Sequence, residues 1–275
     1  MGLYTENTMA IAAIDFGRLY RDHLAAASPR LKSAGAWDRR AASMSVRDRK
    51  FHSHYVDAFV SRMDFTQARS LLDVGCGPGT LCLSLADRFD RIHGLDYSRG
   101  MLDVLMAGAA SRGLTHIEPL HLSWEDDWTE VPECDVVIAS RSTLVSDMAA
   151  ALRKLDEKAR LRVYLTHLVG GCFLDPEIPA LLGRSQPPLP DYIYILNILY
   201  RMGIHPRLDY IENDKGHPDT SDFTDFARRV RWTLGELSAE ELDRLKAWHD
   251  RTKRSAVAPM RWAFISWEKT PAESR

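Results

Sequence analysis

The sequence predicts an α/β fold built on a doubly wound, mostly parallel β-sheet. From residue 70 onward, short apolar runs alternate with amphipathic stretches of helical spacing, which is the pattern of repeated β–α–β units. The runs are rich in Val, Ile and Leu, as is typical of strands that helices cover on both faces. The predicted strands are Ser70–Gly75, Arg91–Asp96, His116–Leu122, Cys134–Ser140 and Arg160–Leu168, and the helices between them are Thr80–Arg88, Met101–Arg112 and Met148–Ala159.

The flanking segments predict helical additions to one core domain. Residues 1–66 predict an N-terminal helical extension that caps the core, and residues 67–275 form the core domain. The alternation breaks after residue 171, where residues 172–204 and 216–256 predict two helical lid insertions. The remaining predicted elements are helices at 14–26, 47–63, 221–234 and 239–254 and strands at 207–212 and 260–267.

The composition excludes several classes of protein. Lys plus Arg total 36 and Asp plus Glu total 38, so the formal net charge is −2 and no basic domain favours nucleic acid. Hydrophobic residues make up 45%, too many for a disordered chain. No apolar run approaches the roughly 18 residues that span a bilayer, and the opening residues lack the basic start of a secretory signal. We therefore expect neither a membrane nor a nucleic-acid partner.

The cysteines predict a reducing environment. Cys76, Cys82, Cys134 and Cys172 are scattered, with no C-x-x-C pair and no regular framework. A chain of 275 residues buries enough core to fold without disulfides. We expect free thiols in the cytoplasm and no metal site.

The strongest functional signal is a glycine-rich turn between the first predicted strand and helix. Residues 71–80 read LLDVGCGPGT and place Gly75, Gly77 and Gly79 at alternate positions. Glycines let a ligand approach the backbone closely, and a helix N-terminus offers free N–H groups. The spacing is G-x-G-x-G rather than the G-x-G-x-x-G of nicotinamide and flavin binders.

Residues 71–80 resemble motif I of the class I S-adenosylmethionine-dependent methyltransferases of the small-molecule type. The resemblance covers roughly residues 68–170 and, more weakly, the closing strand pair. It implies a Rossmann-like methyltransferase fold with a seven-stranded sheet whose last strand lies antiparallel between its neighbours. It also implies S-adenosylmethionine as the cofactor, held by motif I residues Asp73, Gly75, Cys76, Gly77 and Gly79.

The second predicted strand ends in Asp96, about 20 residues after the first glycine. A carboxylate there can accept hydrogen bonds from both ribose hydroxyls of a nucleoside. The alternative role, capping the next helix, suits Ser98 better. Tyr97 and Met101 are predicted to lie beside the adenine and the methionine tail, or else simply to pack.

A third group follows the third strand. Members of the resembled family usually place an aspartate here for the adenine amino group, whereas this sequence has Ser123 at that position. Glu125 or Asp126 is a possible substitute. Trp124 offers a flat face for the purine, although a tryptophan packed on the surface is the alternative.

A fourth group, Ser140 and Arg141, follows the fourth strand. Ligands of open α/β sheets bind beyond the carboxyl ends of the strands, so both residues are predicted to contact the cofactor. A guanidinium close to a sulfonium requires a matching carboxylate from the cofactor or the acceptor. The alternative is an arginine turned out to solvent.

Catalytic residues are not identified by the sequence, and His167 and Arg141 are weak candidates. His167 follows the fifth strand and is a possible general base, or else a histidine merely hydrogen-bonded in place. The predicted substrate-binding residues are aromatic and come from the N-terminal cap and the first lid insertion, with packing as the alternative for each. They are Trp37, Phe51, Tyr192 and Tyr194.

The sequence therefore predicts an enzyme that transfers a methyl group from S-adenosylmethionine to a small molecule. The alternatives are a protein that binds this cofactor without methylating anything and an RNA methyltransferase. The acceptor, the atom methylated, the oligomeric state and the pathway are not predicted.

Overall fold

The computed structural model describes residues 11, 13–29, 31–44, 53–184, 187–212, 222–252 and 260–269. The helices are α2 (Phe16–Ala27), α3 (Ala34–Ala42), α4 (His54–Val60), α5 (Thr80–Ser84), the 3-10 helix η2 (Ala86–Arg88), α6 (Arg99–Ser111), α7 (Met148–Lys158), α8 (Glu177–Leu181), α9 (Ile193–Arg201), α10 (Phe223–Leu234) and α11 (Ala239–Thr252). The strands are β1 (Ser70–Val74), β2 (Arg91–Asp96), β3 (Ile117–His121), β4 (Cys134–Ser140), β5 (Ala159–Leu168), β6 (Arg207–Glu212) and β7 (Arg261–Glu268).

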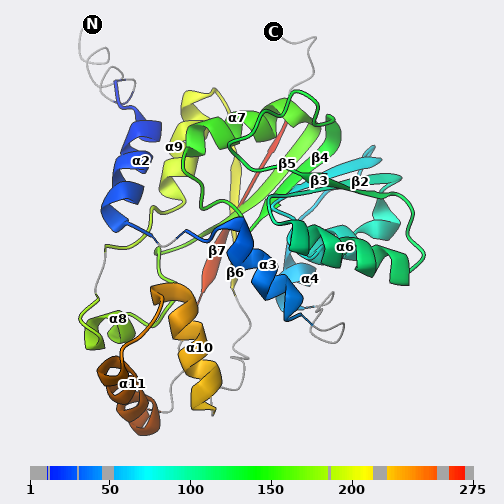
Figure 1. Ribbon diagram of the computed structural model, residues 1–275. Helices are drawn as coiled ribbons and strands as arrows, with labels where there is room; N and C mark the ends of the chain where they lie inside the picture. The colour runs from blue at the N-terminus through cyan, green and yellow to red at the C-terminus, as the bar shows by residue number, and fades with distance from the viewer. Residues whose placement is uncertain are drawn as a thin grey trace, which may run out of the picture.

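The strands form one seven-stranded sheet in the order β3-β2-β1-β4-β5-β7-β6 (Figure 1). The first five strands pair in parallel, and β7 lies antiparallel between β5 and β6. This arrangement confirms the predicted mostly parallel sheet and its inserted last strand. Each strand predicted from the apolar runs lies within one or two residues of an observed one.

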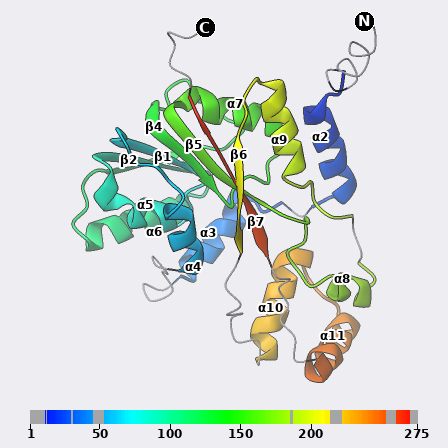
Figure 2. The same cartoon turned by 180° about the vertical axis from the view of Figure 1, so that it is seen from behind.

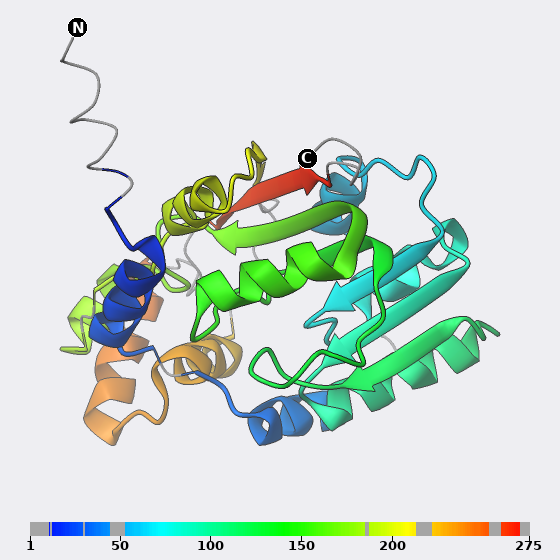
Figure 3. The same cartoon turned by 90° about the horizontal axis from the view of Figure 1, so that it is seen from above.

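Helices cover both faces of the sheet, as the apolar strands predict. One face packs against α2, α7 and α9, which contribute Tyr20, Leu152 and Ile195 to a shared apolar core. Figure 3 shows α7 lying across the sheet, with α9 and α2 to its left. The opposite face packs against α4, α5 and α6. Both faces are therefore dry, and ligand access is left to the edges where the strands end.

A third apolar core joins α8, α10 and α11 through residues such as Ile178, Phe226 and Trp248. The capping box of Ser238 and Glu241 begins α11: the Ser238 N–H donates to Glu241 Oε2 at 2.7 Å, and the Glu241 N–H donates back to Ser238 Oγ at 3.2 Å. Figures 1 and 2 show these three helices together beyond the end of the sheet where β7 begins. We call them the cap helices.

The two predicted lid insertions are built differently. In the first, residues 172–204, α8 joins the cap helices, whereas α9 packs against α2 and α7 over the sheet. In the second, residues 216–256, the described part forms α10 and α11. The predicted N-terminal extension also contributes to the core, because Tyr55 and Phe59 of α4 are buried against the sheet. Within the described residues, no helix is long and apolar enough to cross a membrane.

Candidate active site

The glycine loop connects β1 to α5 in a conformation that favours glycine. Gly75, Gly77 and Gly79 have φ angles of 69°, 55° and 83°. A Cβ atom on Gly75 would lie 2.3 Å from the Cβ of Ser142, and one on Gly79 would lie 2.3 Å from Leu105 Cδ1. A Cβ on Gly77 would meet nothing within 4 Å. Packing therefore demands two of the glycines, while Gly77 faces open space where a ligand can approach the bare backbone.

Asp96 links this loop to the start of α6. It is 6% exposed, and its Oδ2 accepts a hydrogen bond from the Gly77 N–H at 2.8 Å while Oδ1 accepts one from the Ser98 N–H at 2.8 Å. Burial raises the pKa of Asp96, and these N–H donors oppose the rise. Ser98 is the N-cap, because its hydroxyl oxygen accepts from the Met101 N–H. Each carboxylate oxygen of Asp96 keeps acceptor capacity for a ribose hydroxyl.

Asp73 lies beneath the loop rather than in it. It is 2% exposed, and burial raises its pKa to about 7. The Cys82 thiol donates to Asp73 Oδ2 at 3.2 Å. The buried Cys76 lies close enough to interact with both residues, and burial raises the pKa of its thiol. These three side chains support the loop from below and have no exposed face for chemistry.

Tyr97 and Met101 flank the loop on the side of α6. The Tyr97 hydroxyl donates to the carbonyl of Lys32 at 2.8 Å, and burial raises its pKa to about 12. Met101 is 2% exposed in the first turn of α6. Tyr97 thus attaches the chain before α3 to the carboxyl end of β2, and Met101 packs in the helix interface.

The loop after β3 is organised by its own polar groups. The Ser123 N–H donates to Asp126 at 2.7 Å, and the Ser123 hydroxyl accepts from the Glu125 N–H at 3.2 Å. Glu125 accepts a hydrogen bond from Ser146 at 2.8 Å. The Trp124 ring stacks on Trp128, with 5.5 Å between centroids. Ser123, Glu125 and Trp124 therefore all have structural partners within this loop and its neighbour, and their predicted contacts with adenine stay predictions.

Arg141 ends β4 in an unusual backbone conformation. Its φ angle is 57°, a region that side chains other than glycine seldom adopt, and its N–H donates to Thr166 Oγ1 at 3.0 Å. Its guanidinium lies 4.3 Å from the centroid of the Tyr55 ring. No ion pair within the described chain involves Arg141, and the side chain is exposed. Strain of this kind concentrates at functional sites.

Tyr55 of α4 is a site residue that the sequence analysis missed. Its hydroxyl is hydrogen-bonded to Ser140 Oγ at 2.7 Å and to Thr166 Oγ1 at 2.8 Å, and burial raises its pKa. The same residue supports the Arg141 guanidinium with its ring. Tyr55 thus holds the ends of β4 and β5 together beneath the arginine. A lone tyrosine in an N-terminal helix gives no sequence signal for this role.

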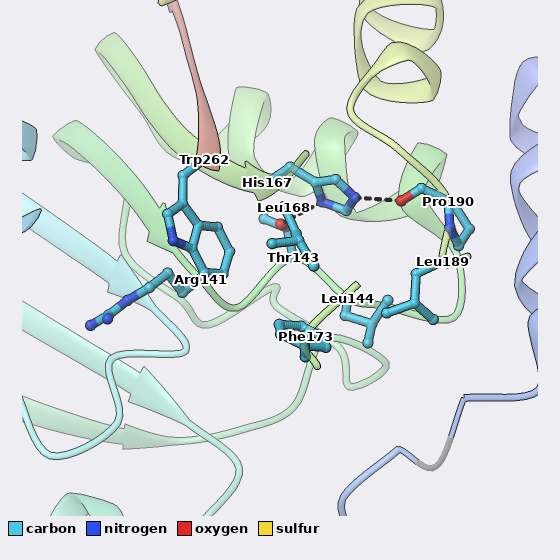
Figure 4. A pocket seen from close by; sticks show the side chains of 9 residues that line it. All are labelled: Arg141, Thr143, Leu144, His167, Leu168, Phe173, Leu189, Pro190 and Trp262. Carbon is cyan, nitrogen blue, oxygen red and sulfur yellow. Dashed lines mark hydrogen bonds between the residues drawn. The ribbon is translucent and has the colours of Figure 1, made fainter. Parts of the chain in front are cut away.

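His167 lines a small cavity at the ends of β4, β5 and β7. The cavity measures about 30 Å³, and its wall includes Arg141, Phe173, Pro190 and Trp262. Figure 4 shows His167 between Thr143 and Pro190, with Arg141 pointing away past Trp262. The two ring nitrogens of His167 are hydrogen-bonded to Thr143 Oγ1 at 2.9 Å and to the Pro190 carbonyl at 3.0 Å. Burial lowers the pKa of His167, which favours a neutral, structurally engaged ring.

The predicted aromatic substrate residues are not brought together. The Tyr192 hydroxyl is hydrogen-bonded to that of Tyr210 on β6 at 2.7 Å, and the Tyr194 hydroxyl to His23 on α2 at 3.0 Å. Trp37 contacts Trp232 of α10 edge to face, with ring centroids 5.2 Å apart. Phe51 lies outside the described residues. Among the described side chains, no group of three or more His, Cys, Asp or Glu could hold a metal ion.

Comparison with known proteins agrees with this geometry. Residues 71–160 match a family described as a methyltransferase domain. An uncharacterised protein of Haemophilus influenzae is 39% identical over 264 residues, which span 94% of this chain and 98% of that protein. Trans-aconitate 2-methyltransferase of Rhodococcus jostii is 29% identical over 123 residues, which are 44% of this chain and 42% of that enzyme.

Solved structures show the same fold. The YcgJ protein of Bacillus subtilis superposes with a TM-score of 0.57 at 12% identity, over 80% of this chain and 100% of that one. Coclaurine N-methyltransferase bound to N-methylheliamine and S-adenosylhomocysteine gives 0.55 at 13% identity, over 98% of this chain and 90% of that one. The sheet, the glycine loop and the matched domain define a methyltransferase. Residues 71–160 belong to the methyltransferase domain family, and the chain as a whole has the fold of a solved methyltransferase.

Proposed function

We propose that this protein transfers a methyl group from S-adenosylmethionine to a small molecule that carries a carboxylate. Arg141 is the observation that carries the proposal. It is fixed in a strained conformation at the end of β4, and within the described chain it has no carboxylate partner. Ser142, the next residue, packs against Gly75 of the glycine loop, so an acid bound to Arg141 would lie beside the cofactor. A planar guanidinium suits bidentate binding of a carboxylate.

The residues of the glycine loop fit S-adenosylmethionine. The open space beside Gly77 admits a ligand against the backbone, and the Asp96 carboxylate is placed to accept hydrogen bonds from ribose hydroxyls. When bound, the cofactor supplies a methyl group on a positively charged sulfur that needs no further activation. The chain's own residues therefore have to orient the acceptor and exclude water.

A carboxylate acceptor also matches the engagement of His167, the candidate base among the described residues that share the cavity wall with Arg141. Carboxylates are ionised at neutral pH, so methylation of a carboxylate oxygen requires no proton transfer. His167, the predicted candidate base, is buried and hydrogen-bonded through both ring nitrogens. Tyr55 and Thr166 hold Arg141 in position, and we assign them a positioning role.

The relatives support an acidic acceptor. Trans-aconitate is a polycarboxylate, and its 2-methyltransferases from Rhodococcus jostii and Mycobacterium tuberculosis are 29% and 33% identical to this chain over 123 and 134 residues. Each match covers less than half of either protein. The support therefore extends to the class of acceptor and not to its identity.

In this proposal the acceptor is covered by the N-terminal cap (residues 1–66) and by the lid insertions of the domain at 67–275. The cavity beside Arg141 is about 30 Å³, whereas small-molecule sites measure about 300–1,000 Å³. Phe173, Leu189 and Pro190, which precede α9 in the chain, form part of its wall. We expect residues 172–190 to move when the acceptor enters, while α9 stays packed on α2. Hydrogen exchange with and without acceptor measures this motion.

A methyl-transfer screen with labelled cofactor tests the proposal. We expect dicarboxylates and tricarboxylates to accept the label as an ester that alkali releases as methanol. Arg141→Lys keeps the charge but loses the planar fork, so kcat/KM should fall by about tenfold to a hundredfold, from about 1.5–3 kcal/mol for hydrogen bonds to a charged group. Transfer to amines alone, with an unchanged rate in Arg141→Lys, would contradict the acidic acceptor.

A further inference from the structure

The wall of the cavity beside Arg141 includes side chains with polar atoms. Among the described residues these are Arg141, Thr143, His167 and Trp262, and the other side chains of the wall are apolar. Thr143 Oγ1 and His167 Nδ1 lie 2.9 Å apart, and the two side chains also reach backbone carbonyls at 2.9 Å and 3.0 Å. Thr143 and His167 are therefore committed to the protein, which leaves Arg141 and Trp262 for a ligand.

Trp262 carries a buried hydrogen-bond donor without a partner. It is the second residue of β7 and pairs in register with Leu168 of β5 and Ile211 of β6, which fixes its backbone. Its side chain is 6% exposed, and its indole Nε1 is buried with no hydrogen-bond partner among the described residues. The indole N–H is a donor only, and leaving a buried donor unpaired destabilises a folded protein. Because native proteins pair nearly all their buried donors, this exception calls for a function.

Tyr55 brings the indole and the guanidinium together. Its ring centroid lies 4.3 Å from Arg141 Cζ, and the ring packs edge to face with the Trp262 indole, with 6.2 Å between centroids. Figure 4 shows the indole nitrogen of Trp262 on the side of the ring that faces Arg141. Tyr55 is itself fixed by hydrogen bonds to Ser140 and Thr166. One aromatic ring therefore holds both donors at the same end of the cavity.

The chemistry of the two donors selects the group that binds between them. A guanidinium and an indole N–H donate hydrogen bonds and accept none. An ionised carboxylate complements them, because it has about four lone-pair sites and carries no hydrogen. An amide of the same shape would turn N–H groups toward these donors and leave some of them unpaired. The positive charge of Arg141 adds to the preference for the acid.

We propose that the Trp262 indole N–H donates a hydrogen bond to the carboxylate of the methyl acceptor and, together with Arg141, selects an ionised acid over its amide. This inference rests on the proposed function and adds a specificity-determining residue to it. Arg141 is exposed and extends past Trp262 in Figure 4, so turning its side chain toward the acid opens the N–H to the same carboxylate. The apolar wall, which includes Leu144 and Phe173, then contacts the carbon skeleton of the acid.

The indole N–H resonances of ¹⁵N-labelled protein test the proposal, with Trp262→Phe identifying the resonance of Trp262 by its loss. Acetate and acetamide at fixed ionic strength are the probes, since they share a shape and differ in charge and hydrogen-bonding atoms. We expect acetate to shift the Trp262 resonance downfield to saturation, and acetamide to act at least about tenfold more weakly. Trp267 of the same strand is the control: its Nε1 already donates to Asp156 at 2.9 Å, so its resonance should not move.

Two results of the titration would overturn the proposal. One is a Trp262 resonance that responds neither to acetate nor to trans-aconitate. The other is a resonance that ignores both acids but moves in Tyr55→Leu, because the N–H would then be directed at the face of the Tyr55 ring, a weaker interaction than a hydrogen bond to oxygen. Far-ultraviolet circular dichroism checks that both variants fold.

Turnover separates this inference from the proposed function. With an acid that accepts the methyl group, Trp262→Phe should raise KM about tenfold to a hundredfold with little change in kcat or in S-adenosylhomocysteine affinity, whereas Trp267→Phe should behave like the original protein. An unchanged KM in folded Trp262→Phe would overturn the inference and leave the proposed function standing. A Trp262 resonance that responds to acids, in a protein that methylates none of them, would support the carboxylate site and refute the proposed function.

Discussion

Asp73 makes the stability of this protein depend on pH in a way that its burial predicts. Its pKa is raised to about 7, against about 3.9 for an aspartate in an unfolded chain. The folded state therefore binds the proton more tightly than the unfolded state does. The stabilisation that this provides is complete below pH of about 4 and is lost as the pH rises to about 7. Three pKa units at about 1.36 kcal/mol each give a change of about 4 kcal/mol.

Replacing Asp73 with asparagine tests this contribution, because it removes the titrating carboxyl and keeps the shape of the side chain. Urea unfolding at several values between pH 4.5 and 8.5 should show the original protein losing stability relative to Asp73→Asn up to about pH 7, and no further change above it. Asp64→Asn is the control: a hydrogen bond from Thr66 lowers the pKa of that exposed carboxyl, so it is ionised in both the folded and the unfolded state over this range. The stability difference between the original protein and Asp64→Asn should therefore hardly vary with pH. A difference between the original protein and Asp73→Asn that does not vary with pH would refute the reasoning.

Three further substitutions test the site. Gly77→Val should abolish S-adenosylhomocysteine binding in calorimetry and cost about 1–2 kcal/mol of stability through its positive φ. Gly79→Val should destabilise the protein more, because its Cβ also meets the Leu105 side chain. Undiminished affinity in folded Gly77→Val would remove the loop from the cofactor site. Asp96→Ala should weaken the affinity for S-adenosylhomocysteine about tenfold to a hundredfold, whereas the affinity for a cofactor without ribose hydroxyls should not change. Equal losses of affinity for both ligands would mean that Asp96 acts only through the loop. Tyr55→Phe should lower kcat/KM about tenfold with little change in cofactor affinity, and an unaltered rate would deny it a positioning role.

Much of the fold could be predicted because local patterns and tertiary structure agree. The β–α–β alternation fixes where strands begin and end, since each apolar run must be buried between two helical layers. The glycines at 75, 77 and 79 could be recognised because their spacing reflects backbone angles that only glycine adopts freely. Such features depend on a residue and its immediate neighbours in the chain, so they can be predicted from the sequence.

The parts of the structure that could not be predicted depend on which surface each helix packs against. The spacing of the aromatic residues in α9 fits either a lid or a buried helix. The structure shows a buried helix, because α2 packs on α9 and places the ring centroid of Tyr20 5.9 Å from that of Tyr194. Tyr55 became a site residue because α4 packs over the ends of β4 and β5. Trp37 of α3 meets Trp232 of α10 across most of the chain. No local pattern contains these contacts.

The buried His167 connects the cover of the cavity to the class of acceptor. The Pro190 carbonyl only accepts hydrogen bonds, so Nε2 carries a proton. Nδ1 lies 2.9 Å from Thr143 Oγ1, and the single proton of that hydroxyl is shared between Nδ1 and the Thr166 carbonyl, also 2.9 Å away. The ring is thus a fixed link between β5 and the segment that covers the cavity, and both of its nitrogens lie against protein oxygens. The proposed function therefore requires an acceptor that needs no deprotonation in the site. A carboxylate paired with Arg141 meets that requirement, and an alcohol does not.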